Sequence, residues 1–514
     1  MILLIDQFLN SIIWESYFPL LAGTGVILTL MTALAAWHYI KTKKMWYYII
    51  TAVYILSFLT VILTDNWFFF LFGWELVTLT TTFLLAWSSW KLVKQYFVIQ
   101  FAGSSILLFA VLTANAAGYA KIGVIDSFWL QFLLIMGVGM KSGLFGFHFW
   151  LPPIHSEAPA PVSAILSGWV VKLGYIFLLK IIPIETGNPI LFFLGFTMIV
   201  YAGWKAFRSS DLKVMLAYST VSQLGFIALA VGIGGKYGFL GAVLHIIAHG
   251  FAKTSLFIAS GIWQKEFGSR VFYDFKDAVL RRPVSGIVTI LGFSSLSGVI
   301  FTAGYNSKYL IKSAHSSGFL NYIIFFLLGL LTFFYAGRTV YWIFFNKNNG
   351  EYSSESLLKD ISSYPIYKTD LAALLIGGIA LIVVGLFPEI PGSLIPQLAD
   401  KDFHILSGIR DTIIYLAVVI FVLKRKSGFV FEVREDLSLE KYLQSFLNFV
   451  YKIGKKSIKF DTEKIFEIFF YNAIFNGARK LYNFIYQDFS IQILWIPIFL
   501  TVLLLWNQIY SFFN

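Results

Sequence analysis

Apolar runs of about 20 residues recur along most of this chain, and each is long enough to cross a lipid bilayer as a helix. Of the 514 residues, 58% are hydrophobic and only 13% are charged. A soluble domain carries about 25% charged residues. Because a helix satisfies its backbone hydrogen bonds internally, we expect an all-α polytopic membrane protein. The runs predict about 14 spans, at 17–38, 45–64, 66–88, 94–119, 125–147, 160–183, 189–207, 213–233, 236–262, 281–318, 319–346, 367–388, 408–424 and 491–512.

Basic residues in the loops predict the orientation. With this span count, one side of the membrane holds few of them: Lys121, Lys180, Lys236, Lys401 and Arg410. The other side holds Lys41, Lys43, Lys44, Lys91, Lys94, Lys205, Arg208, Lys213, Arg270, Arg281, Arg282, Lys347, Lys424, Arg425 and Lys426. Lys and Arg concentrate in cytoplasmic loops, so this asymmetry predicts a multi-pass protein with both termini outside. The N-terminus lacks the features of a cleaved signal peptide.

The character of the chain changes after residue 426. The stretch 427–490 mixes aromatic and charged residues at helical spacing, which predicts an amphipathic lateral helix along the membrane or a partner. The alternative is a cytoplasmic linker. Five regions are expected, namely an N-terminal segment with the first span (1–44), an ion-translocating core (45–346), additional spans (347–426), the lateral helix (427–490) and a C-terminal anchor span (491–514).

Several kinds of site are excluded by the sequence. The chain has no cysteine, which rules out disulfides and Cys-ligated zinc or iron–sulfur clusters. It has no Walker or Rossmann glycine pattern after a plausible strand. We therefore expect no bound cofactor and no metal. The net charge of +12 is explained by cytoplasmic loops and does not indicate nucleic acid.

Five charged residues fall inside segments that otherwise read as spans. A charge at bilayer depth costs about 2.5–3.5 kcal/mol even on lenient scales, so such residues indicate an ion or proton path. Snorkelling to the surface is a credible alternative for Lys308 but a poor one for Lys141 and Lys253, which long apolar sequences flank. The five residues are Glu75, Lys141, Lys172, Lys253 and Lys308.

Two of these spans are predicted to be broken helices. The Lys141 region continues into GLFGFHFWLPPIHSEAPAP, and the long run 281–318 contains FTAGYN before Lys308. Glycine and proline interruptions at corresponding places in two halves indicate an inverted repeat with discontinuous helices. Unwound backbone at that depth lines a hydrated cavity, where a lysine can change its protonation state.

Two further patterns suggest proton transfer. Glu75 needs a nearby cation, and Lys141 is the natural candidate for a switchable pair; a static ion pair that holds two helices together is the alternative. His245, His249 and Lys253 are spaced four residues apart, so they line one face of a helix and could relay protons. A metal site is a weak interpretation of the two histidines, because no carboxylate of that helix completes it.

Four motifs occur in order: GWELVTLTTTFLL, GMKSGLFGFHFWLPPIHSEAPAPVSAILSGWVVKLGY, SSDLKVMLAYSTVSQLGF and HIIAHGFAKTSLFIASG. Together they resemble the antiporter-like proton-conducting membrane subunits of complex I, the Mrp-type antiporters and the membrane-bound hydrogenases. The resemblance covers roughly residues 45–345. It implies two half-channels joined by a central polar axis. On that axis it places Glu75, Lys141, Lys172, His245, His249, Lys253 and Lys308, with Lys308 exchanging protons with the other side.

The resemblance implies a non-catalytic ion-translocating subunit of a redox-driven translocase, NADH:quinone oxidoreductase-like or hydrogenase-like, in the cell membrane. Its expected partners are other membrane subunits, lipid, and H⁺ or Na⁺; spans poor in Asp and Glu favour protons. The alternatives are a subunit of a secondary Na⁺/H⁺ antiporter, a membrane subunit of an inorganic-carbon uptake complex, and a small-solute transporter on the same scaffold.

Lys308 and the amphipathic stretch resemble the long distal subunit with its lateral helix. Three differences from that subunit are expected. Two spans precede the Glu75 helix, where the family has four, and the connection from Glu75 to Lys141 is short. About 60 residues of helix reach only about 90 Å, too short for the full lateral brace. These differences favour a smaller relative of complex I.

Overall fold

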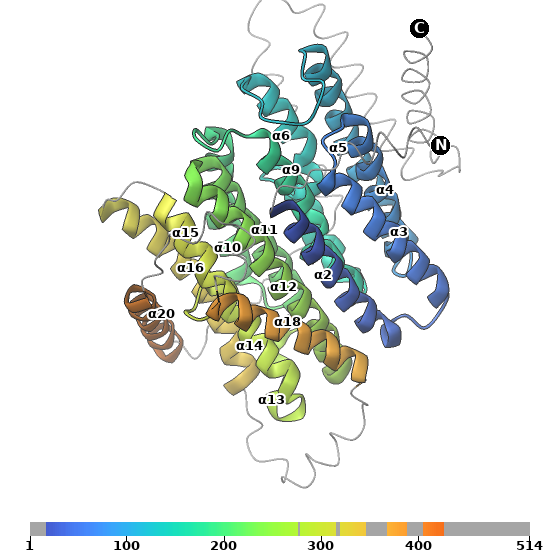
Figure 1. The fold of residues 1–514 in the computed structure, drawn as a ribbon. Coiled ribbons are helices and arrows are strands. Elements are labelled where there is room, and N and C mark those ends of the chain that lie inside the picture. The colour runs from blue at the N-terminus through green and yellow to red at the C-terminus, as the bar shows by residue number, and fades with distance from the viewer. Residues whose placement is uncertain (1–16, 276–277, 315–318, 346–366, 388–404, 426–514) are drawn as a thin grey trace, which may run out of the picture.

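The computed structural model describes residues 17–275, 278–314, 319–345, 367–387 and 405–425, and helices form nearly all of their regular structure (Figure 1). Within those ranges there is no β-strand, and an isolated antiparallel bridge pairs Asp211 with Val271. The all-α fold expected from the apolar pattern is therefore confirmed. The predicted lateral helix at 427–490 and the anchor span within 491–514 lie outside the described residues.

The first helices form one side of the bundle (Figure 1). Polar residues set their beginnings: the Asn66 side chain accepts hydrogen bonds from Phe68 N and Phe69 N, and Ser89 Oγ accepts one from Leu92 N. Such caps satisfy backbone donors that a first helical turn leaves unpaired. These helices are α2 (Tyr17–Tyr39), α3 (Lys44–Leu63), α4 (Trp67–Leu85), α5 (Trp90–Ala116) and α6 (Phe128–Ser142).

The helix that carries Lys141 is interrupted, as the sequence predicts. Helix α6 ends where the backbone of Gly143 adopts a left-handed conformation (φ 63°). Gly146, three residues later, also has a positive φ (88°). A side chain disfavours that conformation, which explains the glycines. The chain then forms the short helices η1 (His148–Trp150) and α7 (Leu151–Glu157).

A further break occurs where the sequence predicts one continuous span, 160–183. The chain forms α8 (Ala160–Gly168), one 3₁₀ turn η2 (Val170–Lys172) and α9 (Leu173–Ile181). Lys172 therefore lies at the end of the turn that separates two short helices. Gly168 and Gly174 flank this break, but neither has the positive φ that ends α6 and α14.

Two fully buried helices form the centre of the bundle. Helix α12 (Gly235–Phe267) packs against α2, α8, α11, α14, α15 and α18. Helix α11 (Leu212–Ile233) lies beside it, with α10 (Pro189–Arg208) on its outer side. The loop after α12 contains η3 (Phe272–Asp274) and leads to α13 (Ala278–Arg281).

The second predicted break, in 281–318, is also confirmed. Helix α14 (Pro283–Ser297) ends at Gly298 (φ 77°), and α15 (Ala303–Ala314) begins five residues later. The remaining described helices are α16 (Phe319–Phe345), α18 (Lys368–Leu386) and α20 (Ile405–Arg425).

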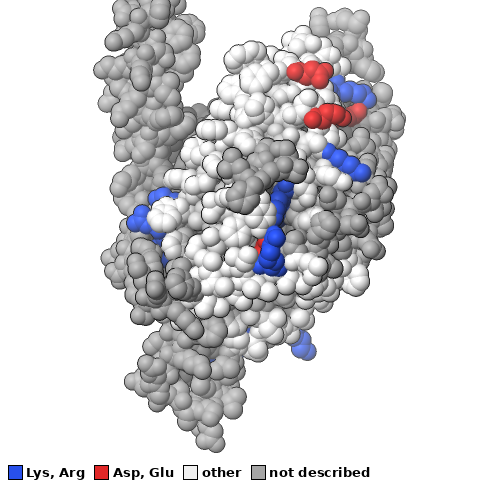
Figure 2. All heavy atoms as spheres, turned by 90° about the vertical axis from the view of Figure 1, so that its left-hand side faces the viewer, with Lys and Arg blue, Asp and Glu red and all other residues white. Residues whose placement is uncertain are grey.

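Ten helical stretches of the described residues are long and apolar enough to cross a membrane, with Ala160–Ile181 (α8, η2 and α9) counted as one, and α6 and α14 are shorter apolar helices. Figure 2 shows one face of the molecule, on which most of the described surface carries neither acidic nor basic side chains. A lipid-facing surface requires this composition, because charges are costly in hydrocarbon. The chain is a multi-pass membrane protein.

Candidate functional site

The predicted residues Glu75 and Lys141 lie close together but are not joined by an ion pair in the described structure. Lys141 is 2% exposed, and its ammonium donates hydrogen bonds to Trp74 O (2.9 Å) and Thr78 Oγ1 (2.6 Å). It also lies 4.4 Å from the centre of the Trp74 ring. Glu75 is half-buried and near enough for the two charges to interact.

Lys172 is fully buried at the break between α8 and α9, and its ammonium donates to Ser167 O. A close approach of helices connects this region to Lys141. A methyl group at Gly174 would overlap Ser142 Oγ, so α9 touches α6 at the residue after Lys141. Ser142 Oγ is buried and has no hydrogen-bond partner among the described residues. Polar groups thus continue from Lys141 towards Lys172.

Further polar contacts join the region of Lys172 to α11 and α12. Ser167 Oγ lies 2.7 Å from Thr220 Oγ1. On the same turn of α11, Ser219 Oγ accepts a hydrogen bond of 2.5 Å from Lys253, which also donates to Leu216 O (2.9 Å). Lys172 and Lys253 therefore each bond to a residue whose neighbourhood meets on α11: Lys172 bonds to Ser167, which contacts Thr220, and Lys253 bonds to the adjacent residue Ser219.

Glu75, Lys141, Lys172 and Lys253 and the hydroxyl groups near them form a row of polar residues through the bundle. The two histidines of α12 continue this row, as their spacing predicts. The rings of His245 and His249 are parallel to within 4°, with centroids 6.1 Å apart. His245 Nδ1 lies 2.9 Å from Ser307 Oγ, while neither ring nitrogen of His249 has a partner among the described residues. Both side chains are 1% exposed, so these nitrogens are shielded from bulk solvent.

Lys308 follows Ser307 on α15. Its ammonium donates to Leu296 O (2.6 Å), at the broken end of α14, and lies 3.4 Å from Thr332 Oγ1. Gln223 Nε2 reaches the same threonine (3.4 Å) and also Tyr335 (2.9 Å). Lys308 thus contacts both the broken helix and α16.

A cavity of about 70 Å³ lies between α15, α16 and α20. Its lining includes Lys308, Lys312, Tyr309, Asp411 and Tyr415. Lys312 and Asp411 form an ion pair of 3.3 Å in which both side chains are partly exposed. The cavity therefore lies between Lys308, at one end of the row, and the partly exposed ion pair of Lys312 and Asp411.

The whole arrangement has one carboxylate and four lysines. Lys141, Lys172 and Lys253 hydrogen-bond to carbonyl and hydroxyl oxygens, and among the described residues none of them is in a salt bridge. A buried charge without an opposite charge costs several kcal/mol, so a structural role alone explains these lysines poorly. No cluster of three or more His, Cys, Asp or Glu in the described residues could hold a metal ion.

Some residues of the row were not predicted. Hydroxyl side chains are common in these apolar helices, so position in the sequence does not distinguish those that contact the lysines. The structure adds Thr78, Ser142, Ser167, Ser219, Thr220, Ser307 and Thr332. The only available sequence signal was the motif context that Thr78, Ser142, Ser167, Ser219 and Thr220 share with the predicted residues.

Comparison with known proteins places this row in a family context. Residues 64–334 match the family described as NADH:quinone oxidoreductase/Mrp antiporter, TM. The chain is 27% identical over 392 residues to a Na(+)/H(+) antiporter subunit of Alkalihalophilus pseudofirmus, covering 67% of this chain and 48% of that protein. It is 31% identical over 266 residues to NAD(P)H-quinone oxidoreductase chain 4-2 of Synechocystis sp., covering 48% and 47%. The aligned parts thus span less than half the length of these relatives.

A solved structure shows the same fold. A chain of the Mrp complex from Dietzia sp. superposes with a TM-score of 0.68 at 20% identity, covering 93% of this chain and 56% of that one. The matched family region, 64–334, contains every residue of the polar row from Glu75 to Thr332.

Proposed function

This chain belongs to the NADH:quinone oxidoreductase/Mrp antiporter transmembrane family, and on that premise we propose that it is an ion-translocating, antiporter-like subunit of a redox-driven membrane complex. The ion is the proton. The observation that carries this proposal is the row of buried titratable groups, spaced by hydroxyl groups, that runs from Glu75 to Lys308 across the described bundle.

The row has the chemistry of a proton path. Lysine and histidine both bind and release protons, and a histidine can accept at one ring nitrogen while it donates from the other. Hydroxyl groups donate and accept, so Ser219 and Ser307 can pass hydrogen bonds between the titratable groups. Water molecules that enter a polar, buried space can bridge the remaining gaps.

Glu75 and Lys141 form the control end of this path in our proposal. When the lysine hydrogen-bonds to Thr78, the carboxylate is unpaired; when it turns to Glu75, the pair holds the positive charge at this end. Moving that charge changes the electrostatic cost of a proton on Lys172. Redox chemistry in partner subunits would supply the energy for this movement.

Lys308 forms the exchange end, since the cavity beside it leads to the partly exposed pair of Lys312 and Asp411. We further propose the finer architecture: about 14 spans, an inverted repeat that relates the α6 and α14 breaks, and a lateral helix at 427–490 before a last span. The two glycine-terminated breaks support the repeat. We also propose that the protein lies in the cell membrane with both termini outside, an orientation that the basic loops support.

A secondary Na⁺/H⁺ antiporter is the second candidate. The alignment that covers 67% of this chain is to a protein named as a component of such an antiporter. Other relatives are named as a quinone oxidoreductase chain and, in Methylacidiphilum infernorum, a hydrogenase-4 component. The names of these two relatives support the redox-driven complex, and the scarcity of carboxylate ligands for Na⁺ among the described residues of the row favours the proton.

The testing experiment is purification of the tagged chain from its native membranes in mild detergent, with mass spectrometry of the proteins that accompany it. Flavin, iron–sulfur or hydrogenase-like subunits are expected. Recovery with membrane subunits alone, together with Na⁺/H⁺ exchange in vesicles, would overturn the redox proposal in favour of the antiporter. The purified assembly is then reconstituted to measure proton translocation directly.

A further inference from the structure

An arginine outside the row, Arg338, is buried near the end of α16. It is 1% exposed, and its Nη2 donates to Ser209 O between α10 and α11. Its Cζ lies 5.2 Å from the centre of the Phe207 ring and 5.1 Å from that of Phe272. Among the described residues, Nε and Nη1 have no hydrogen-bond partner and no carboxylate pairs with the guanidinium. A positive charge is thus held between two aromatic rings.

Polar side chains of α16 connect this arginine to the end of the row. Lys308 Nζ lies 3.4 Å from Thr332 Oγ1. Gln223 Nε2 donates both to that hydroxyl (3.4 Å) and to Tyr335 Oη (2.9 Å). Tyr335 is three residues after Thr332 and three before Arg338, so it is a neighbour of both on the helix surface. Buried polar groups therefore lead from Lys308 to the arginine over a rise of about 9 Å along α16.

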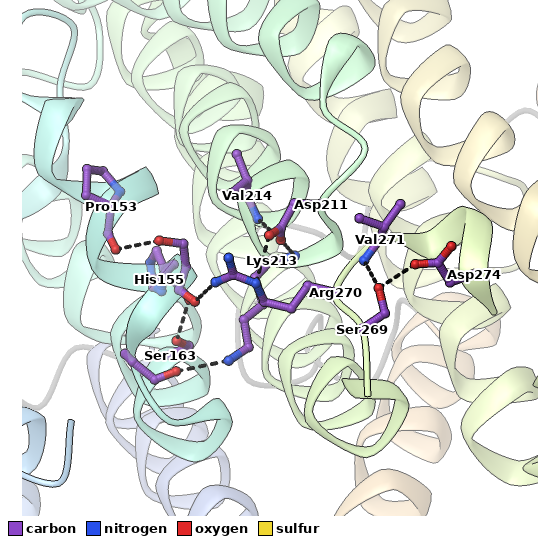
Figure 3. Close-up of polar contacts among 12 residues, drawn as sticks. Pro153, His155, Ser163, Asp211, Lys213, Val214, Ser269, Arg270, Val271 and Asp274 are labelled. Atoms are coloured by element: carbon purple, nitrogen blue, oxygen red, sulfur yellow. Dashed lines mark hydrogen bonds and ion pairs between the residues drawn. The ribbon is translucent and has the colours of Figure 1, made fainter. Parts of the chain in front are cut away.

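Two chain segments cover the arginine at this end of the bundle, namely the residues just before α11 and the loop after α12. A backbone hydrogen bond from Phe272 N to Ser210 O (3.2 Å) joins them. An ion pair of 3.0 Å between Asp211 and Arg270 joins them as well (Figure 3). The side chains of that pair are 21% and 39% exposed. Solvent therefore reaches the protein two residues from Ser209, whose carbonyl binds the buried guanidinium.

A structural link alone explains this arginine poorly. The neutral amide of a glutamine could donate the same hydrogen bond to Ser209 O, and it would avoid burying a charge that has no opposite charge beside it. The aromatic rings recover part of that cost, because a cation is attracted to a ring face. An arginine differs from glutamine, and from the lysines of the row, in carrying a charge that it does not lose.

We propose that Arg338 is an electrostatic barrier, which closes the row towards the end of the bundle where α11 begins. This inference rests on the proposed function. In its absence a proton on Lys308 could pass Thr332 and Tyr335 and reach the solvent at that end. Such a leak would return protons across the membrane without useful work. With the barrier, exchange at Lys308 is restricted to the cavity between α15, α16 and α20.

The physical basis of the barrier is repulsion between like charges. The guanidinium has no lone pair that accepts a further proton, and it keeps the protons that it has, so it cannot act as a relay. A proton that approached Tyr335 would meet this fixed charge in a low-dielectric interior, where the repulsion is far stronger than in water. A fixed arginine charge beside a pore excludes protons and other cations in the same way.

The test measures passive proton leak through the complete assembly in proteoliposomes, without an electron donor or Na⁺. A potassium diffusion potential drives protons inwards, and a pH-sensitive dye inside the vesicles reports their influx. Arg338→Gln keeps a donor for Ser209 O and removes the charge, so we expect the influx to rise roughly fivefold or more. Thermal melting checks folding. If Arg338→Gln does not assemble, Arg338→Met takes its place.

Two further variants identify the origin of the leak. Arg281→Gln is the matched control, because Arg281 also lies over an aromatic ring, that of Phe267 (5.6 Å), but pairs with Glu266 (3.9 Å). It should leave the influx within about twofold of wild type. Lys308→Met, added to Arg338→Gln, should abolish the extra influx, because the leaked protons come from the row. A leak through loosened helix packing would persist in that double variant.

Wild-type influx in Arg338→Gln and Arg338→Met would overturn the barrier. An increased influx that persists after Lys308→Met would also overturn it, since those protons would not have come from the row. Supplying an electron donor to the wild-type assembly separates the two hypotheses. If no protons are then translocated, the proposed function itself fails. If they are translocated while the Arg338 variants show no leak, only the barrier fails.

Discussion

Lys141 Nζ lies 2.6 Å from Thr78 Oγ1, so the lysine is bound to the helix that carries Glu75, close to that carboxylate but not paired with it. Its second acceptor, Trp74 O, directly precedes Glu75 in the chain. Small rotations of a flexible lysine side chain would exchange the hydroxyl for the carboxylate. This geometry fits a pair whose strength changes during transport better than a permanent structural link.

Replacing Lys141 should stop translocation without preventing assembly. In Lys141→Met the side chain keeps its length but cannot carry a proton, so we expect proton transfer to fall about tenfold or more. The measurement is proton flux in proteoliposomes. Lys121→Met is the control, since that lysine is 67% exposed and pairs with Asp65 at the surface, where a salt bridge contributes little. Undiminished proton flux in Lys141→Met would refute the hypothesis that Lys141 is part of the proton path.

Removing the hydroxyl that contacts His245 should slow transfer to a smaller degree. Ser307→Ala deletes the 2.9 Å contact to Nδ1, which leaves the tautomer of the histidine unconstrained. A reduction of about 3- to 10-fold is expected, with unchanged assembly. Ser313→Ala, on the same helix, removes only a hydrogen bond to Tyr309 O and should have no effect on flux. Equal rates in both variants would show that Ser307 has no part in transfer.

The close approach of α9 to α6 should tolerate no added methyl group. Gly174→Ala would overlap Ser142 Oγ, and overpacking of a core costs about 1–3 kcal/mol. We expect a lower melting temperature in detergent. Gly23→Ala makes the same change on α2 where no atom lies within 4 Å, and it should leave the melting temperature unchanged or raise it. Equal stability of the two variants would contradict the packing described for these helices.

The break between α14 and α15 depends on the backbone of Gly298. Its φ of 77° disfavours a side chain, and an added Cβ would lie 3.0 Å from Lys308 Cδ. Gly298→Ala should therefore destabilise the protein by about 1–2 kcal/mol. Gly298→Asn should be less destabilising if backbone conformation dominates, because asparagine adopts left-handed conformations more readily. Thermal melting of both variants distinguishes the backbone cause from the contact with Lys308. If the alanine variant is more stable than the asparagine variant, the loss of stability comes from contact with Lys308.

The breaks at Lys141 and Lys308 were predictable because glycine and proline act locally. A glycine with positive φ ends a helix whatever surrounds it, so GMKSGLFG indicated unwound backbone before any tertiary contact was known. In the second break the glycine with positive φ is Gly298, whereas Gly304 of FTAGYN lies inside α15. The break at Lys172 was not predictable. No local residue requires it, and the close contacts of Gly168 with Thr254 and of Gly174 with Ser142 show that packing of α8 and α9 governs this segment.

The amino-acid sequence alone establishes that this is a helical membrane protein with titratable groups inside apolar spans, because apolar run length and the cost of a buried charge are properties of single segments. It also determined that His245, His249 and Lys253 share a face, since helical periodicity requires it. The packing of the helices against one another fixes which hydroxyl groups lie between the lysines, and that Thr78 rather than Glu75 binds Lys141. These relationships join residues up to 63 positions apart, and they depend on how helices pack, which no local pattern encodes.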